Sequence, residues 1–374
     1  MDTNKQTAGV AAVILAAGQS RRMGRPKQLV RVAGKTLLEH TIANVGATGV
    51  HEIALVLGAG ADEIRNQLML KGVKVVVNPE FQQGMGTSIG AGLRALSPTA
   101  TAALIVLADQ PFVQPATLDQ LIACYANEKP QIVIPVFKGF RGNPVLLDRS
   151  VFPEVMGLTG DVGCRAIFGE HTQGIHKLAV DDVGVLLDAD TTEDVEELEN
   201  YMTGRSRILP DMELREEFRA GSGAELVLVG HGAMPVALAK LAHMLRFRVT
   251  LVDPLLRLDQ FPEADCIVHV LDFSLIDSPE RYVVVASRGR CDEEAIEQAL
   301  ASGAKYVAMV ANRKRSQEVL RSLAEHGVAD LHTVRAPAGI DIGAESPEEI
   351  ALSIMSEIVA VRRKFLAANE RESK

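Results

Sequence analysis

Short runs of apolar residues alternate with longer amphipathic stretches along the first half of the chain. The runs are rich in valine, isoleucine and leucine and lack polar alternation, which is typical of strands buried on both faces. They occupy positions 11–17, 52–58, 73–78, 102–109 and 131–136. Because the stretches between them are long enough to form crossover helices, the pattern predicts parallel strands covered by helices.

The same pattern begins again after a polar interruption. Residues 204–223 are mostly polar and end in a Gly-Ser-Gly sequence, a composition typical of a linker. Further apolar runs follow at 225–232, 247–254, 265–271, 281–287 and 304–310. We therefore predict an α/β fold of two Rossmann-like, doubly wound domains with mostly parallel sheets, residues 1–203 and 224–374. A last helix is expected from Pro347 to about Phe365, with Ser346 as its N-cap.

Composition narrows the class of protein. The chain has 374 residues, of which 47% are hydrophobic, so it is long and apolar enough to form two hydrophobic cores. Its formal charge of -9 makes nucleic acid an unexpected partner. No apolar run reaches the ~20 residues that span a bilayer, and the polar start does not resemble a signal peptide. We expect a cytoplasmic protein with no membrane partner. Its four scattered cysteines form no CxxC pair, which disfavours a disulfide framework or a zinc site.

A loop of small and basic residues follows the first apolar run. It reads Leu15-Ala16-Ala17-Gly18-Gln19-Ser20-Arg21-Arg22-Met23-Gly24-Arg25-Pro26-Lys27. Small residues let the backbone approach a ligand closely, and the basic side chains can neutralise a triphosphate. The spacing excludes a Walker A loop, because Arg25 stands where lysine is required. A surface turn would explain the glycines alone, whereas a phosphate-binding loop explains the whole pattern.

Two aspartates are candidates for a metal site. Asp109 ends the run 102–109 and so lies at the carboxyl edge of the predicted sheet, where ligands of open α/β sheets bind. A carboxylate there suits Mg²⁺, which is held by one or two protein carboxylates together with phosphate oxygens and water. Asp190 is the second candidate, but it or Thr191 could equally cap the helix that follows.

Several motifs make the first half recognisable. The loop resembles the signature of the MobA-like nucleotidyltransferases, and in detail that of the MocA branch, the molybdenum cofactor cytidylyltransferases. The resemblance spans about residues 10–201, and the other matching motifs are Asn78-Pro79, Gly84-Met85-Gly86-Thr87-Ser88, Asp109-Gln110-Pro111, Arg141-Gly142-Asn143-Pro144, Gly160-Asp161-Val162-Gly163 and Asp190-Thr191 with Asp194.

This resemblance implies a reaction and a set of site residues. An acceptor phosphate of molybdenum-molybdopterin would attack the α-phosphorus of CTP, giving molybdopterin cytosine dinucleotide and pyrophosphate. Ala17 matches the family members that use CTP, since GTP users have glycine there. Asp109 and Asp190 would hold Mg²⁺. Catalysis would involve Lys27, Arg22 and Asp109, and the nucleotide would be bound by Leu15, Ala16, Ala17, Gly18, Arg22, Lys27, Gly86 and Ser88.

Other functions stay open for this half. The loop and the aspartates do not themselves name the acceptor, so a sugar-phosphate nucleotidyltransferase fits the same residues. A non-catalytic cofactor-binding maturation chaperone with a vestigial transferase is the alternative from another class.

The second half carries an incomplete dinucleotide-binding fingerprint. Gly230 and Gly232 follow a strand, and Asp253 ends the next strand, as such a unit requires. The third glycine is missing, and Pro235 occupies its place. A tight turn explains the glycines equally well. We take Gly230, His231, Gly232 and Asp253 as a possible dinucleotide or cofactor site.

The remaining motifs of this half resemble the Rossmann domain of the XdhC/CoxI family over residues 224–364. They are the segments 286–295, 312–315 and 336–351. That family comprises maturation factors of molybdenum hydroxylases, which implies an apo molybdenum hydroxylase as a possible partner and a second domain that binds or hands on the product. An NAD(P)-dependent oxidoreductase is disfavoured here because no acid or hydride-site partner is evident. The basic run 313–315 could be a solvated helix start or a phosphate clamp.

Overall fold

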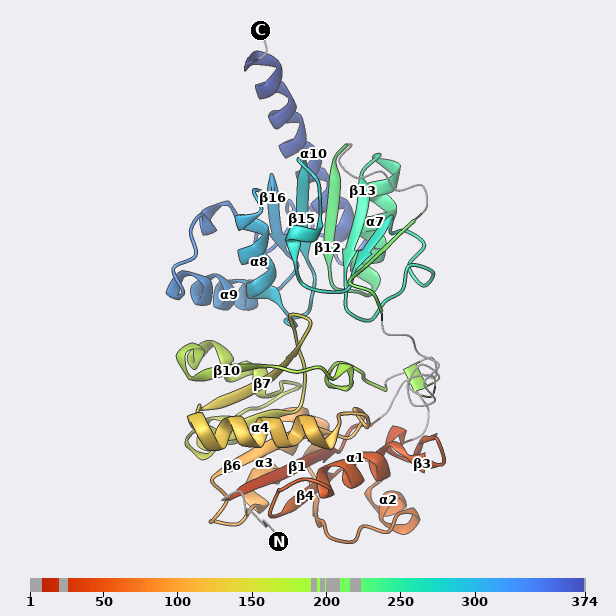
Figure 1. Cartoon of the computed structure of the whole chain (residues 1–374), viewed down its shortest axis with the longest axis vertical. Helices are drawn as coiled ribbons and strands as arrows, with labels where there is room; N and C mark the ends of the chain where they lie inside the picture. The colour runs from red at the N-terminus through yellow and green to blue at the C-terminus, as the bar shows by residue number, and fades with distance from the viewer. Residues whose placement is uncertain are drawn as a thin grey trace. The chain divides into compact units, whose positions relative to one another are not determined.

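The computed structural model describes residues 9–19, 26–189, 194–195, 199, 209–215 and 223–372. By their internal contacts the residues divide into two compact units (Figure 1). The first comprises Met1–Phe137 with Arg141–Arg207, and the second comprises Lys138–Phe140 with Ile208–Lys374. Within the described ranges, none of the helices has the length and apolar character needed to cross a membrane.

The first sheet is mostly parallel. Its strand order is β10-β7-β9-β6-β1-β4-β5, with β8 paired to β7, and β9 runs antiparallel to both of its neighbours. The chain order reverses between β1 and β6, which makes a topological switch point at their carboxyl ends. The strands are β1 (Val10–Ala16), β4 (Ile53–Leu57), β5 (Lys74–Val77), β6 (Ala102–Leu107), β7 (Ile132–Phe137), β8 (Phe140–Arg141), β9 (Val145–Asp148) and β10 (Ile175–Ala179).

Helices cover both faces of this sheet. On one face α3 (Met85–Ala95) and α5 (Phe152–Met156) share a core with the side chains of Val13 and Val56. On the other, α1 (Leu37–Gly46) and α4 (Pro115–Glu128) contact each other and the sheet (Figure 1). A small hairpin of β2 (Arg31–Val32) and β3 (Lys35–Thr36) precedes α1, and α2 (Ala61–Gln67) follows β4.

The second sheet has the order expected of a Rossmann domain. Its strands lie in the order β11-β14-β13-β12-β15-β16, and all neighbours are parallel except the edge pair β11 and β14. The order reverses at β12, between β13 and β15. The strands are β11 (Met212–Leu214), β12 (Glu225–Val229), β13 (Arg248–Val252), β14 (Cys266–Val268), β15 (Arg281–Val285) and β16 (Tyr306–Met309).

Helices flank this sheet (Figure 1). One face packs against α7 (Ala233–Met244) and α10 (Pro347–Glu372), whose apolar side chains join those of β12, β13 and β15 in one core. α8 (Asp292–Ala301) contacts β15 and β16, and α9 (Arg313–Glu325) contacts α8. The prediction of two Rossmann-like α/β domains with mostly parallel sheets is therefore confirmed.

The start of α10 also follows the sequence. Ser346 Oγ accepts the Glu349 amide at 3.2 Å, and the Glu349 carboxylate accepts the Ser346 amide at 3.0 Å, which together form a capping box. The helix continues to Glu372 rather than ending near Phe365.

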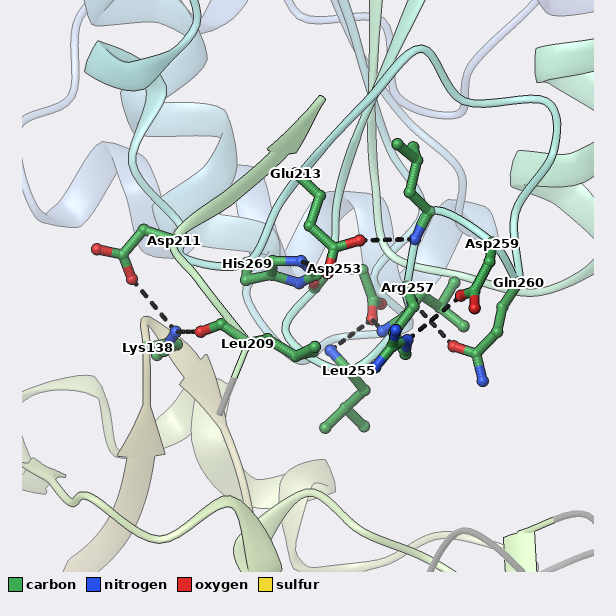
Figure 2. Close-up of polar contacts among 12 residues, drawn as sticks. Lys138, Leu209, Asp211, Glu213, Asp253, Leu255, Arg257, Asp259, Gln260 and His269 are labelled. Atoms are coloured by element: carbon green, nitrogen blue, oxygen red, sulfur yellow. Dashed lines mark hydrogen bonds and ion pairs between the residues drawn. The ribbon is translucent and has the colours of Figure 1, made fainter. Parts of the chain in front are cut away.

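Part of the predicted linker 204–223 is instead a strand of the second sheet. Met212–Leu214 pair with the edge strand β14 as β11. The Glu213 carboxylate accepts the Leu258 amide at 2.9 Å (Figure 2), and Arg215 Nε donates to the Ala264 carbonyl at 2.7 Å. Backbone pairing with β14 and the hydrogen bonds of Glu213 and Arg215 fix this segment in place. It therefore forms a strand without the run of apolar residues from which the other strands were predicted.

Gly92 sets the distance between α3 and the first sheet. A β-carbon at Gly92 would lie 2.3 Å from Val13 Cγ1 and 3.0 Å from Val56 Cγ2. Both valines are fully buried, so they have little room to move. The absence of a side chain at this one helix position is therefore required by the packing.

We expect Gly92→Ala to lower the free energy of unfolding of the first unit by about 1–3 kcal/mol, because overpacking outweighs the better helix propensity of alanine. Urea unfolding measures this. Gly46→Ala, at the end of α1 with nothing within 4 Å of the new β-carbon, is the matched control and should change stability by less than about 1 kcal/mol. Equal stability of the two variants would contradict the packing argument.

Candidate functional site

In the first unit, two residues predicted from the sequence meet at the switch point between β1 and β6. Lys27 Nζ forms an ion pair and hydrogen bond with Asp109 Oδ2. Asp109 follows the end of β6, and Lys27 opens a single 3₁₀ turn after the loop. Both side chains are about one-fifth exposed, so they lie near the surface rather than in the core.

Gln28 ties the loop to this turn. Its side chain is buried, and its Nε2 donates to the carbonyl of Ala16 at 2.9 Å and to that of Gly18 at 3.4 Å. Its Oε1 has no hydrogen-bond partner within the described part of the chain. Gln28 was not predicted as a site residue, because its only signal in the sequence was its position next to Lys27.

The backbone after β1 is closely packed. Ala59 donates its amide to the Ala17 carbonyl at 3.3 Å, and Ala108 donates to the Leu15 carbonyl at 3.1 Å. A β-carbon at Gly58 would lie 2.8 Å from the Ala17 oxygen. The carbonyl groups of Leu15 and Ala17 therefore accept hydrogen bonds from neighbouring backbone amides. The Ala17 methyl lies in the core. Gly18 is exposed.

The second metal candidate and one basic candidate cannot be placed. Asp190 and Arg22 lie outside the described residues. Next to Asp190 in the chain, Ala189 donates its amide to the backbone carbonyl of Asp109 at 2.9 Å. The Asp188 carboxylate accepts a hydrogen bond from Gln110 Nε2 at 2.5 Å. The segment that ends at Ala189 thus runs beside Asp109.

Gly86 and Ser88 lie at the start of α3 in tight packing. Gly86 donates its amide to the Gly160 carbonyl at 3.2 Å, and a β-carbon there would lie 2.8 Å from the Leu158 oxygen. Ser88 is buried, and its hydroxyl accepts from Asn78 Nδ2 at 3.0 Å. These contacts explain why a glycine at position 86 and a serine at position 88 fit the packing. The contact of Gly86 and Ser88 with a nucleotide stays a prediction.

In the second unit, the turn after β12 is built around two glycines. Gly230 and Gly232 have φ of 100° and 108°, a region that disfavours other residues. A β-carbon at Gly230 would lie 2.7 Å from the Ala286 oxygen, and one at Gly232 would lie 2.9 Å from a guanidinium nitrogen of Arg288. The glycines therefore let the segment after β15 approach the turn.

Asp253 holds His231 within this turn. Its Oδ2 lies 2.6 Å from His231 Nδ1. Its Oδ1 accepts the amides of Leu255 and Leu256, both at 3.0 Å (Figure 2). Burial raises the pKa of Asp253, but the hydrogen bonds from His231 and from the two amides outweigh it, so that the pKa lies below its ordinary value. Asp253 is therefore a buried carboxylate that remains ionised.

Three residues that were not predicted as site residues complete a hollow here. Ser287, Arg288 and Arg290 line it together with Gly230, His231 and Asp253. Asp292 shapes their turn, since its carboxylate accepts the Ser287 hydroxyl and the Gly289 amide. The available signal was the family resemblance of segment 286–295, which marked the segment without assigning roles.

The basic run at the start of α9 fits neither of its two interpretations at Arg315. That side chain is mostly buried and pairs with Asp292 at 3.2 Å and with Glu293 at 3.6 Å. Arg315 thereby helps to hold Asp292, whose carboxylate accepts hydrogen bonds from Ser287 and Gly289. Asn312 caps the helix by accepting the Arg315 amide at 2.9 Å.

Comparison with known proteins assigns both units. Residues 12–175 match the model of the MobA-like NTP transferase domain, and residues 226–358 match that of the XdhC Rossmann domain. The chain is 31% identical over 197 residues to the nicotine blue oxidoreductase of Paenarthrobacter nicotinovorans, which covers 49% of this chain and 93% of that protein.

A second curated protein and one solved structure are also similar to parts of the chain. The uncharacterized protein YqeB of Escherichia coli K12 is 34% identical over 152 residues, which is 38% of this chain and only 28% of that protein. The crystal structure of Rv0371c from Mycobacterium tuberculosis H37Rv is 33% identical, with a TM-score of 0.49, over 52% of this chain and 98% of that one.

These findings confirm the family resemblance drawn from the sequence motifs of both halves. The chain belongs to the MobA-like NTP transferase family, as a nucleotidyltransferase whose second unit is an XdhC Rossmann domain.

Proposed function

We propose that the first unit transfers the cytidylyl group of CTP to molybdenum-molybdopterin, giving molybdopterin cytosine dinucleotide and pyrophosphate. The observation that carries this proposal is the contact between Lys27 and Asp109 at the switch point, beside the described part of the glycine loop. A cation and a carboxylate at one crevice suit a reaction that needs charge neutralisation and positioning more than a nucleophilic side chain.

Each residue has a role in this proposal. Lys27 binds the phosphates of the nucleotide, together with Arg22. Asp109 and Asp190 would hold Mg²⁺, which fits because the Asp109 carboxylate is a hard oxygen donor that is partly exposed at the sheet edge. When bound, the ion neutralises phosphate charge. Gln28 keeps the backbone of Ala16 and Gly18 in place.

The preference for CTP rests on Ala17. Its methyl group packs in the core and does not touch the base. Ala17 therefore influences nucleotide choice by setting the position of the backbone that contacts the nucleotide. The XdhC unit binds the product and hands it to an apo molybdenum hydroxylase, and the protein acts in the cytoplasm.

A second candidate function comes from the relative in Paenarthrobacter. It shares 31% identity over almost its whole length and is named an oxidoreductase. The same residues would then serve an oxidoreductase reaction in place of nucleotidyl transfer. A sugar phosphate as the acceptor is the alternative within the transferase class, and a non-catalytic maturation chaperone is the alternative without turnover.

We predict that the purified chain releases pyrophosphate with Mg²⁺, molybdenum-molybdopterin and CTP, and much more slowly with GTP. Asp109→Asn should lower kcat by about 100-fold, because one preorganised charged group is lost. Asp62→Asn, an exposed aspartate in the first turn of α2, is the matched control and should keep normal turnover.

Other outcomes separate the alternatives. Preference for GTP would overturn the role of Ala17. Turnover only with a sugar phosphate would replace the acceptor. Oxidation of NADPH by a dye, abolished in Asp109→Asn, would favour the oxidoreductase, and no turnover in any assay would favour the chaperone.

We predict that Gln28→Ala raises the KM for CTP by about tenfold or more, with a smaller effect on kcat. The substitution leaves the buried carbonyl of Ala16 without its donor and frees the loop. Steady-state kinetics measure this effect, and Gln67→Ala, an exposed glutamine of α2, is the control. An unchanged KM would show that Gln28 does not shape the nucleotide site.

A further inference from the structure

A cysteine, a glutamate and a histidine meet at the edge of the first sheet. Cys124 and Glu128 lie one turn apart in α4 and therefore on the same face of that helix. His176 is the second residue of the edge strand β10. The Cys124 sulfur, a Glu128 carboxylate oxygen and a His176 ring nitrogen all lie within 4.8 Å of one another. Three potential metal ligands thus converge from α4 and β10 (Figure 1).

This group lies at the opposite end of the sheet from the proposed nucleotide site. His176 pairs with Val133, the second residue of β7, so both are near the amino ends of their parallel strands. β7 and β6 run in the same direction, since each is antiparallel to β9. Asp109 instead follows the carboxyl end of β6. A cation bound by the group would therefore be separate from the Mg²⁺ proposed at Asp109.

The group combines a buried sulfur with accessible partners. Cys124 is 8% exposed, whereas the side chains of His176 and Glu128 are 32% and 54% exposed. Burial and the negative charge of Glu128 raise the pKa of the Cys124 thiol, so without a metal the thiol is protonated and unreactive. A cation from solvent can reach the group past the exposed Glu128.

His176 and Glu128 already face each other as two ligands would. His176 Nδ1 lies 2.6 Å from Glu128 Oε2. Ligand atoms around a tetrahedral zinc ion lie about 3.3–3.8 Å apart, because the bonds from zinc to nitrogen, oxygen and sulfur are about 2.0–2.3 Å long. The pair must therefore open by about 1 Å, which rotation of the exposed Glu128 side chain allows. An ion would then take the place of the proton between the two atoms.

The mixture of ligand atoms selects the type of ion. A thiolate and an imidazole suit zinc, whereas Mg²⁺ and Ca²⁺ prefer oxygen ligands alone. Three protein ligands leave a fourth position for water. The absence of a CxxC pair disfavoured a zinc site, but the spacing of cysteines does not report a histidine that the fold brings in from about 50 residues later.

We propose that Cys124, Glu128 and His176 bind a zinc ion that ties the carboxyl end of α4 to the edge strand β10. The ion replaces the thiol proton, which passes to solvent. It stabilises the first unit because the three ligands come together only in the folded chain. The proposal does not depend on the reaction of the first unit.

The experiment uses Co²⁺ as the probe, because a cobalt–thiolate bond gives a charge-transfer band in the near ultraviolet that oxygen and nitrogen ligands do not give. The reduced, metal-free full chain is titrated with Co²⁺. We expect a saturable band that is lost in Cys124→Ala and is displaced by Zn²⁺, which such sites bind more tightly. His176→Gln and Glu128→Gln should each raise the Kd for Co²⁺ by about tenfold or more, since even changes outside the ligand shell cost about 10- to 100-fold.

The first unit offers a matched control for each kind of ligand. Cys164 is also buried, with 7% exposed, and Cys164→Ala should keep the band. Glu154 forms a similar pair with His171, at 2.6 Å, so Glu154→Gln should leave the Kd unchanged. Asp109→Asn should change neither, which separates this ion from the Mg²⁺ of the proposed reaction.

Two results would overturn the ligand set. One is the absence of a thiolate band, or a band that persists in Cys124→Ala. The other is an unchanged Kd in both His176→Gln and Glu128→Gln, which alter only partly exposed side chains and so leave the core intact.

Urea unfolding of the full chain tests the structural role. Zn²⁺ at about 100 times its Kd should lower the unfolding equilibrium constant of the first unit by about 100-fold. At the same concentration, His176→Gln should reduce this effect to about tenfold or less, because its Kd is higher. Binding of Zn²⁺ without a gain in stability would overturn the role of the ion as a tie between α4 and β10.

Discussion

The reversal of strand order in each sheet is the constraint on which both sites depend. Parallel strands end at one edge, and where the order reverses, the connections leave in opposite directions and open a crevice. In the first sheet this happens between β1 and β6, and in the second beside β12. The backbone there must turn sharply next to its neighbours, which explains why small residues are required at Gly58, Gly230 and Gly232.

The two units place different chemistry at their switch points. In the first, a lysine and a carboxylate are in contact, and a buried glutamine holds the loop that precedes them. In the second, a carboxylate is withdrawn into the protein and presents a histidine, while an arginine reaches across the helix start.

The sequence predicted the strands well because their apolar runs are buried on both faces. It missed β11 because that strand has no such run, and its Leu214 is half exposed. Backbone pairing with β14, about 50 residues later in the chain, decides its conformation. Lys27 was found as part of the basic loop and Asp109 by its place at the carboxyl end of a strand, and the family resemblance then placed both in one site.

The missed site residues share a physical cause. Gln28 acts on carbonyl groups of a different turn, and Arg288 acts across a glycine more than 50 residues earlier in the chain. Asp253 and His231 were both predicted as site residues, but the contact between them became evident only from the geometry. The pattern of apolar residues indicates which positions are buried, and motifs give the spacing of residues along the chain. Neither specifies which side chain a carboxylate contacts in the folded protein.

In the proposed reaction, the first unit joins a nucleotide to a phosphorylated acceptor. We would follow CTP labelled at the α-phosphorus during incubation with the protein, molybdenum-molybdopterin and Mg²⁺. We expect the label to appear in a dinucleotide together with the pterin, in an amount equal to the pyrophosphate released. Label that stays in CTP, or that leaves as free CMP with no acceptor attached, would contradict it.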